Sequence, residues 1–202
     1  MVLMNIFLFL ATIKPLESMT TTANSGNTGI ALVQAKTNST EAQKKVAENV
    51  IKSALNKESK GDNKGALADF NKAVIMAPDQ GAAYWYRGIF IGKKLHDYKG
   101  ALADFNQSLK LNPNLIKAYY DRGELRAFAL DDFQGAMSDF NKAIQADPSY
   151  VYPYAGRARL KYYKLKDSAG GIADMKYALG ALKKKGDAEN YQILSEELKK
   201  WK

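Results

Sequence analysis

The chain has 202 residues, enough for one ordinary domain or for a few repeats that share a continuous core. It contains no cysteine, which excludes disulfides, thiolate metal sites and a cysteine nucleophile. The formal net charge of +9 allows attraction to acidic partners, anionic lipid or nucleic acid. The excess of basic residues is spread along the chain, with 3 in residues 1–60, 4 in 61–180 and 2 in 181–202, which is typical of a solvated surface.

Residues 1–40 read as a targeting-like apolar segment followed by a polar linker. The run Val2–Ile13 is shorter than the about 20 residues that a transmembrane helix needs, but it has the length of a signal-peptide core. The first basic residue, Lys14, follows this run, whereas a signal peptide carries basic residues before it. Residues 20–28 are rich in Thr, Ser, Asn and Gly, as linkers are.

Two cleavage sites are compatible with this segment, one among the small residues at 18–23 and one after the pattern Val33-Gln-Ala35. An export signal or membrane-proximal anchor would place the protein outside the cytoplasm or near a membrane, with membrane contact through residues 1–13 only. An untargeted leader would leave it in the cytoplasm. Both interpretations remain open at this point.

One phrase organises the rest of the chain. Gly65-Ala-Leu-Ala-Asp-Phe-Asn71 returns 35 residues later at 100–106, again at 135–141 as Gly-Ala-Met-Ser-Asp-Phe-Asn, and more weakly at 170–175. A fixed period of this size is the signature of a solenoid built from one supersecondary unit.

Periodicity and capping residues predict the helices in chain order. The first follows a potential N-cap at 38–40 and covers 41–60, and the second covers 63–76 and is closed by Pro78. The same hairpin recurs with helices at 80–94 and 98–111, at 115–129 and 133–146, and at about 150–164 and 168–184. A final amphipathic helix at 187–201 is suited to cover the exposed end. Each second helix is preceded by an aspartate that can accept from its free amides, namely Asp62, Asp97, Asp132 and Asp167.

The pattern of residues at about 47–180 resembles the tetratricopeptide repeat family. That family has an aromatic and then a small residue in the first helix, followed in the second helix by small, aromatic and small residues and a proline. In the first helices the aromatic residues are Tyr84, Tyr119 and Tyr154, and the small residues are Gly88, Gly123 and Ala158. In the second helices the small, aromatic and small residues and the proline are, repeat by repeat, Ala66, Phe70, Ala73 and Pro78; Ala101, Phe105, Ser108 and Pro113; and Ala136, Phe140, Ala143 and Pro148.

The resemblance implies an all-α fold, a right-handed α-α superhelix of antiparallel helical hairpins. The hairpins would occupy 41–78, 79–113, 114–148 and 149–180, and residues 181–202 would form a C-terminal capping helix. Glycine in a helix interior costs about 1 kcal/mol relative to alanine, so Gly88 and Gly123 predict close approach of another helix. The period is 35 rather than the family's usual 34, and we expect the extra residue to make a longer turn with Leu95, Leu130 and Leu165 as an apolar plug.

A ladder of opposite charges follows the same period. Arginines recur in the first helices and aspartates in the second, and we expect them to pair at the packed seams, either within or between repeats. With three arginines and four aspartates, one carboxylate has no arginine partner; it is Asp69 or Asp174, depending on whether pairing runs within or between repeats. The ladder comprises Arg87, Arg122, Arg157, Asp69, Asp104, Asp139 and Asp174.

Nothing in the sequence predicts catalysis, a metal or a cofactor. The single histidine, His96, lies in a turn without a second metal ligand, and there is no phosphate loop, nucleophile elbow or zinc-binding helix motif. We therefore expect a protein that is not an enzyme.

The resemblance places a binding groove on the inner side of the first helices. Its aromatic and arginine residues are of the types that dominate binding hot spots. An alternative is that some of these rings pack back against Leu95, Leu130 or the capping helix. The groove residues would be Trp85, Tyr86, Ile89, Lys93, Tyr120, Asp121, Glu124, Phe128, Arg159, Tyr162 and Tyr163.

The favoured hypothesis is a protein–protein interaction scaffold that binds a peptide or partner protein in this groove. Some members of the family clamp an acidic peptide C-terminus, but at the corresponding positions only Lys117 fits here, the others being Val50, Ala54, Tyr86 and Asp121. The alternative hypothesis is a nucleic-acid or anionic-surface binder that uses the positive charge with interleaved aromatics. The oligomeric state and the identity of the partner do not follow from the sequence.

Overall fold

The computed structural model describes the backbone of residues 27–201 and the side chains of residues 41–201. Within that part of the chain there are nine α-helices, one π-helical stretch and no strand. The bounds are α1 Asn27–Ser59, α2 Asn63–Met76, α3 Gly81–Lys94, α4 Tyr98–Leu111, α5 Ile116–Phe128, α6 Phe133–Ala146, α7 Tyr152–Arg159, η1 Leu160–Lys164, α8 Ser168–Lys185 and α9 Ala188–Lys199.

Residues Thr40–Lys202 form a compact unit of their own. The apolar run at residues 2–13 and the first candidate cleavage site lie outside the described residues. None of the described helices combines the length and the apolar character that a membrane crossing requires.

The second helices agree with prediction, since the bounds of α2, α4 and α6 are the expected ones. The expected N-cap at residues 38–40 is wrong, because the first helix runs through these residues and begins at Asn27. The sequence offers no interruption there, since good helix formers such as Ala31, Leu32 and Ala35 lie between Asn27 and the expected cap.

The turn of each hairpin has a recurring geometry. The predicted caps are confirmed, because Asp62, Asp97, Asp132 and Asp167 each accept a hydrogen bond from the backbone amide of the glycine three residues later. The residue before each of these aspartates has a left-handed backbone, with φ of 81° at Gly61 and between 52° and 60° at His96, Asp131 and Lys166.

The predicted apolar plug is wrong in the second and fourth hairpins. Leu95 is 46% exposed and Leu165 is 42% exposed, so these side chains do not fill the turn. The longer turn is closed by the backbone instead, because the amides of Asp97, Asp132 and Asp167 each reach a carbonyl six residues earlier in the first helix. In the first hairpin, the amide of Asp62 reaches back only five residues, to Lys57.

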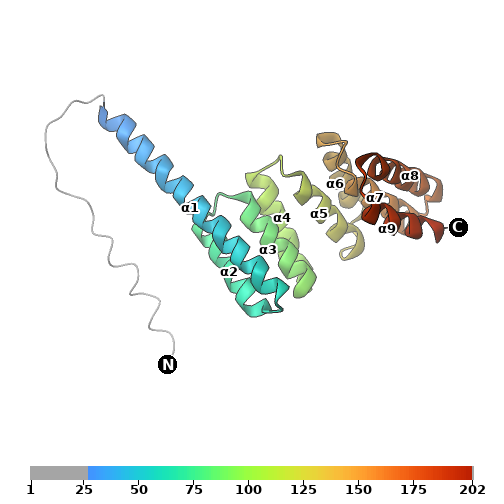
Figure 1. Ribbon diagram of the computed structural model, residues 1–202, viewed down its shortest axis with the longest axis horizontal. Coiled ribbons are helices and arrows are strands. Elements are labelled where there is room, and N and C mark those ends of the chain that lie inside the picture. The colour runs from blue at the N-terminus through green and yellow to red at the C-terminus, as the bar shows by residue number, and fades with distance from the viewer. Residues whose placement is uncertain (1–26, 202) are drawn as a thin grey trace. The chain divides into compact units, whose positions relative to one another are not determined.

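The hairpins pack in chain order (Figure 1). Within a hairpin, α3 packs on α4, α5 on α6 and α7 on α8, and successive hairpins meet where α2 packs on α3, α4 on α5 and α6 on α7. Each helix therefore contacts mainly its neighbours in the chain, as expected of a solenoid in which every unit buries its apolar face against the next.

The seams between helices bring small residues against aromatic rings, as the sequence predicts. Gly88 lies against the ring of Phe105, and Gly123 lies against the ring of Phe140, which is fully buried. Phe70 packs on Phe90 with ring centroids 5.2 Å apart. Burial of large rings against small residues allows the helix backbones to approach closely.

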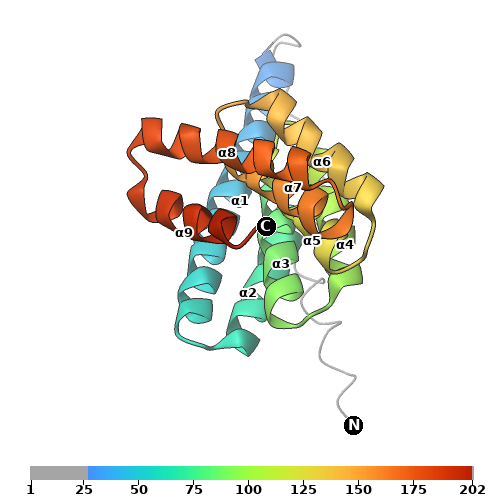
Figure 2. The same ribbon diagram turned by 90° about the vertical axis from the view of Figure 1, so that its right-hand side faces the viewer.

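The C-terminal helix α9 covers the last hairpin. It packs on α8, and the two lie side by side in Figure 2. Leu194 and Trp201 are 5% and 7% exposed and belong to the core of the fourth hairpin, whereas Ile193 faces solvent. This segment therefore closes the apolar end that a solenoid would otherwise leave open.

We expect Gly123→Ala to destabilise the protein by about 1–3 kcal/mol, because overpacking a filled core forces side chains out of their preferred positions. A Cβ at Gly123 would stand 2.8 Å from a ring atom of Phe140. The matched control is Gly180→Ala in α8, where nothing lies within 4 Å and a gain of up to about 1 kcal/mol is expected. Urea unfolding of both variants checks this, and equal shifts for the two would contradict the close approach at Gly123.

Candidate functional site

The arginine ladder pairs within repeats. Arg87 Nε and Nη2 donate to the two carboxylate oxygens of Asp104 at 2.8 and 2.7 Å. Arg122 binds Asp139 in the same way at 2.9 and 2.6 Å, and Arg157 binds Asp174 at 2.8 Å through both nitrogens. Bidentate arginine–carboxylate pairs are strong and fix the relative orientation of the two side chains.

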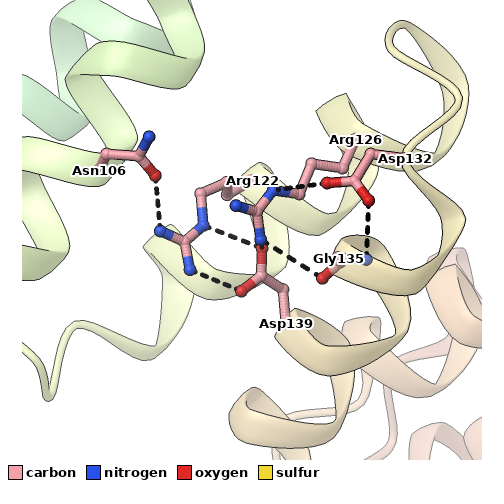
Figure 3. Close-up of polar contacts among 6 residues, drawn as sticks. All are labelled: Asn106, Arg122, Arg126, Asp132, Gly135 and Asp139. Carbon is pink, nitrogen blue, oxygen red and sulfur yellow. Dashed lines mark hydrogen bonds and ion pairs between the residues drawn. The ribbon is translucent and has the colours of Figure 1, made fainter.

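The third nitrogen of each arginine reaches the preceding repeat. Arg122 Nη1 donates to the amide oxygen of Asn106 at 2.7 Å, and Figure 3 shows the guanidinium between Asn106 and Asp139. The equivalent bonds run from Arg87 to Asn71 at 3.1 Å and from Arg157 to Asn141 at 2.6 Å. The last residue of the repeated phrase therefore links each hairpin to the next.

Further cations complete the ladder. Arg126 Nη1 also donates to Asp139 at 2.7 Å (Figure 3), and Lys161 Nζ lies 2.9 Å from Asp174. The carboxylate left over is Asp69, which lies 2.7 Å from Lys57 Nζ and accepts from the hydroxyl of Ser53. The bond from Lys57, helped by that from Ser53, lowers the pKa of Asp69. These contacts make the ladder part of the scaffold rather than a reactive row.

A second face of α3 and α5, other than that of the ladder, carries the second group of candidate residues. Trp85 Nε1 donates to Asp121 Oδ2 at 2.7 Å, and the ring of Tyr86 packs on that of Trp85 with centroids 4.6 Å apart. The ammonium of Lys117 lies 6.0 Å from the centroid of the Trp85 ring. Helical residues one or two positions apart point in different directions. Trp85 and Tyr86 therefore do not share the helix face of Arg87.

A cavity of about 270 Å³ lies beside these residues, between α3, α4 and α5. Five of the predicted groove residues line it, which shows that the sequence pattern does bring them together. The lining residues are Ile89, Gly92, Lys93, Tyr98, Ala101, Phe105, Tyr120, Asp121, Glu124 and Leu125.

Two carboxylates in this cavity are largely withdrawn from water. Burial raises the pKa of Asp121, against the hydrogen bond from Trp85, and burial raises the pKa of Glu124 to about 6. Glu124 Oε1 is buried and has no hydrogen-bond partner among the described residues. It extends toward α7, where a Cβ on Gly156 would stand 2.6 Å from it, so the glycine provides the space for this carboxylate.

Other predicted groove residues have different surroundings. Tyr120 packs on Phe140, Tyr150 and Tyr152 with ring centroids 6.0–6.2 Å apart, so its ring supports the cavity wall from within the fold. Phe128 lies at the end of α5 and is 39% exposed. No observation shows either residue in contact with a partner, and their binding role stays a prediction.

The C-terminal segment contacts the fourth-repeat part of the predicted groove. Arg159 Nε and Nη2 both bind the carboxylate of Glu197 in α9, at 2.9 to 3.1 Å. The ring of Tyr162 stacks on Trp201 with centroids 4.3 Å apart, and the Tyr163 hydroxyl accepts from Trp201 Nε1 at 2.8 Å. The alternative that groove rings pack back on the C-terminal segment is therefore confirmed for Tyr162, whereas Tyr163 stays 46% exposed and its binding role stays a prediction.

Comparison with known protein families identifies one of these hairpins. Residues 116–150, the third hairpin, match the family model described as tetratricopeptide repeat. This match covers one of the four hairpins. No curated protein sequence matches the chain.

Solved structures that resemble the chain cover 57–75% of it. A crystal structure of MamA is 20% identical and covers 73% of this chain and 89% of its own, with a TM-score of 0.61. TTC0263, a thermophilic TPR protein of Thermus thermophilus, is 18% identical and covers 75% and 80%, with a TM-score of 0.64. The first TPR of Spaghetti (RPAP3), bound to the HSP90 peptide SRMEEVD, is 21% identical and covers 57% and 90%, with a TM-score of 0.54. At these identities the similarity establishes the superhelical solenoid fold.

Sequence reasoning missed the linking asparagines and the tyrosines that support the cavity. Asn71, Asn106 and Asn141 recur at the period of the arginines, and this shared spacing was the signal that could have paired them. Tyr150 and Tyr152 lie at the start of the fourth hairpin, and the residues 35 positions earlier are Leu115 and Lys117, so no repeated pattern in the sequence indicates their contact with Tyr120.

No group of three His, Cys, Asp or Glu side chains is arranged to hold a metal ion in the part of the chain that the structure describes. His96 lies in an exposed turn, with Nδ1 3.2 Å from the hydroxyl of Tyr98.

We expect Glu124→Gln to stabilise the protein above pH 6. The pKa of Glu124 is about 6 in the fold against an ordinary 4.5, so the folded state binds the proton more tightly and loses stability as pH rises from 4.5 to 6. Glutamine keeps the shape and removes this cost, which gives a gain of up to about 2 kcal/mol at pH 7 and little change at pH 4. Thermal unfolding at the two pH values measures it, and a variant less stable than the parent at pH 7 would contradict the account.

Proposed function

We propose that the chain is a non-catalytic interaction scaffold that binds an extended or helical peptide segment of a partner protein on the inner side of α3 and α5. The observation that best supports this proposal is the cavity between α3, α4 and α5. Trp85 and Tyr86 lie nearby, on the same helix as Ile89 and Lys93. A concave site with apolar walls and a few convergent polar groups is the usual form of a ligand site, and Trp and Tyr are the types that dominate binding energy.

The fold supports a protein ligand, since one structural relative is bound to a peptide of HSP90. We do not expect this chain to bind an acidic peptide C-terminus. Lys117, the one residue that fits a carboxylate clamp, directs its ammonium over the Trp85 ring, and the neighbouring clamp position holds the carboxylate of Asp121. The ligand is thus a different kind of peptide from an acidic C-terminus.

A matched pair of variants tests this proposal. Peptides selected from a random phage-displayed library on the full chain would be synthesised and their affinities measured by fluorescence anisotropy. Ile89→Glu places a charge in the cavity, and Ile75→Glu places the same charge on α2, where Ile75 is 78% exposed.

We expect the selected peptides to bind the parent and Ile75→Glu equally and Ile89→Glu at least about tenfold more weakly, because a charge would be buried at the contact. Circular dichroism melts confirm that both variants are folded. Selection of no peptide, or equal binding to all three proteins, would contradict a groove on α3 and α5.

A further inference from the structure

We propose that the cavity between α3, α4 and α5 receives a basic side chain, lysine or arginine, of the bound peptide. This inference rests on the proposed function and adds the chemistry of the ligand. Its basis is a cavity with apolar walls in which two carboxylates lie together without a cation bound to them.

The shape of the cavity suits one long side chain. Its volume of about 270 Å³ is slightly below the usual range of ligand sites, about 300 to 1,000 Å³. Ile89, Ala101, Phe105 and Leu125 give it apolar walls. The aliphatic stem of a lysine or arginine packs well on such walls while its charged head seeks a polar partner.

The charge arrangement selects a cation. Asp121 and Glu124 are three residues apart in α5 and therefore lie on one face of that helix. The hydrogen bond from Trp85 reaches only Oδ2 of Asp121. Glu124 lines the cavity, and its Oε1, which is buried toward Gly156 of α7, has no hydrogen-bond donor among the described residues. Neither carboxylate has an ion pair within 4 Å among the described residues, in contrast to Asp69, Asp104, Asp139 and Asp174 of the ladder.

The cations near these carboxylates do not satisfy them. Arg159, from α7, lowers the pKa of Glu124, but its Nε and Nη2 are bound to Glu197 of α9. Lys93, from α3, lowers the pKa of both carboxylates, yet it is exposed at the cavity edge. Burial outweighs both effects and raises both pKa values. A cation delivered into the cavity would relieve this cost, since a buried charge is stable only when it is paired.

The test uses two peptides that differ only in charge. Acetyl-Gly-Ala-Arg-Ala-Gly-amide and the same peptide with citrulline in place of arginine have nearly the same shape, but citrulline is neutral. Both would be titrated into the ¹⁵N-labelled full chain at pH 7, and affinities would be taken from amide shifts in α3 and α5. We expect the arginine peptide to bind at least about fivefold more tightly and to shift the amides of Asp121 and Glu124.

Four variants sharpen the result. Glu124→Gln and Asp121→Asn remove one charge each while keeping a similar shape, and we expect each to weaken binding of the arginine peptide at least about threefold. Lys93→Met removes a competing cation and should tighten binding, an effect that simple apolar binding would not produce. Glu189→Gln, on the exposed part of α9, removes the same charge elsewhere and should leave binding unchanged. Circular dichroism melts report whether each variant is folded. If Asp121→Asn does not fold, the affinity of Glu124→Gln for the arginine peptide decides the result.

The outcomes separate this inference from the proposed function. Equal affinity for the arginine and citrulline peptides, or equal binding by the parent and Glu124→Gln, overturns the basic side chain. Library peptides that depend on Ile89 but contain no basic residue overturn it as well and leave the scaffold function standing. Failure of the library selection together with no shift from either short peptide overturns both.

Discussion

The three-way contact of an arginine with an aspartate of its own repeat and an asparagine of the preceding one holds the stack together. Arg122 illustrates it, with two bonds to Asp139 and one to Asn106. The guanidinium also lies over the ring of Tyr119, 5.6 Å from its centroid. Because Asp139 is 1% exposed, it needs this cation, and because the arginine is held rigidly, it can bridge two hairpins at a fixed separation.

This contact determines which faces of α3 and α5 are left for the proposed groove. The arginines of α3 and α5 are committed to the seam with the second helices, so residues on other faces of the same helices remain for the groove. The cavity with Asp121 and Glu124 lies there, and its carboxylates lack the partners that the ladder provides to its own. The ladder carboxylates all have ion pairs, whereas these two have none among the described residues and remain buried at a stability cost, which is typical of functional sites.

Sequence reasoning predicted the repeating part well because local chemistry determines it. The aspartate caps and closing prolines fix the ends of α2, α4 and α6, and the glycines identify the close contacts at Phe105 and Phe140. The start of α1 at Asn27 was not predictable from Asn38, Ser39 and Thr40, because residues that can cap a helix are also tolerated inside one. The packing of α9 on Arg159 and of Trp201 on Tyr162 depends on tertiary contacts with no period in the sequence. For the same reason, the unpaired state of Glu124 appears only when the neighbours of α5 are in place.

The link between repeats is tested most directly by a double-mutant cycle on the free energy of unfolding. The cycle combines Asn106→Ala with Arg122→Met, and the control cycle combines Asn71→Ala with Arg122→Met, because Asn71 contacts Arg87 instead. The account predicts a coupling energy of about 1 kcal/mol for the contacting pair and about zero for the control. Equal coupling in the two cycles would contradict the role of the arginine as the bridge between successive hairpins.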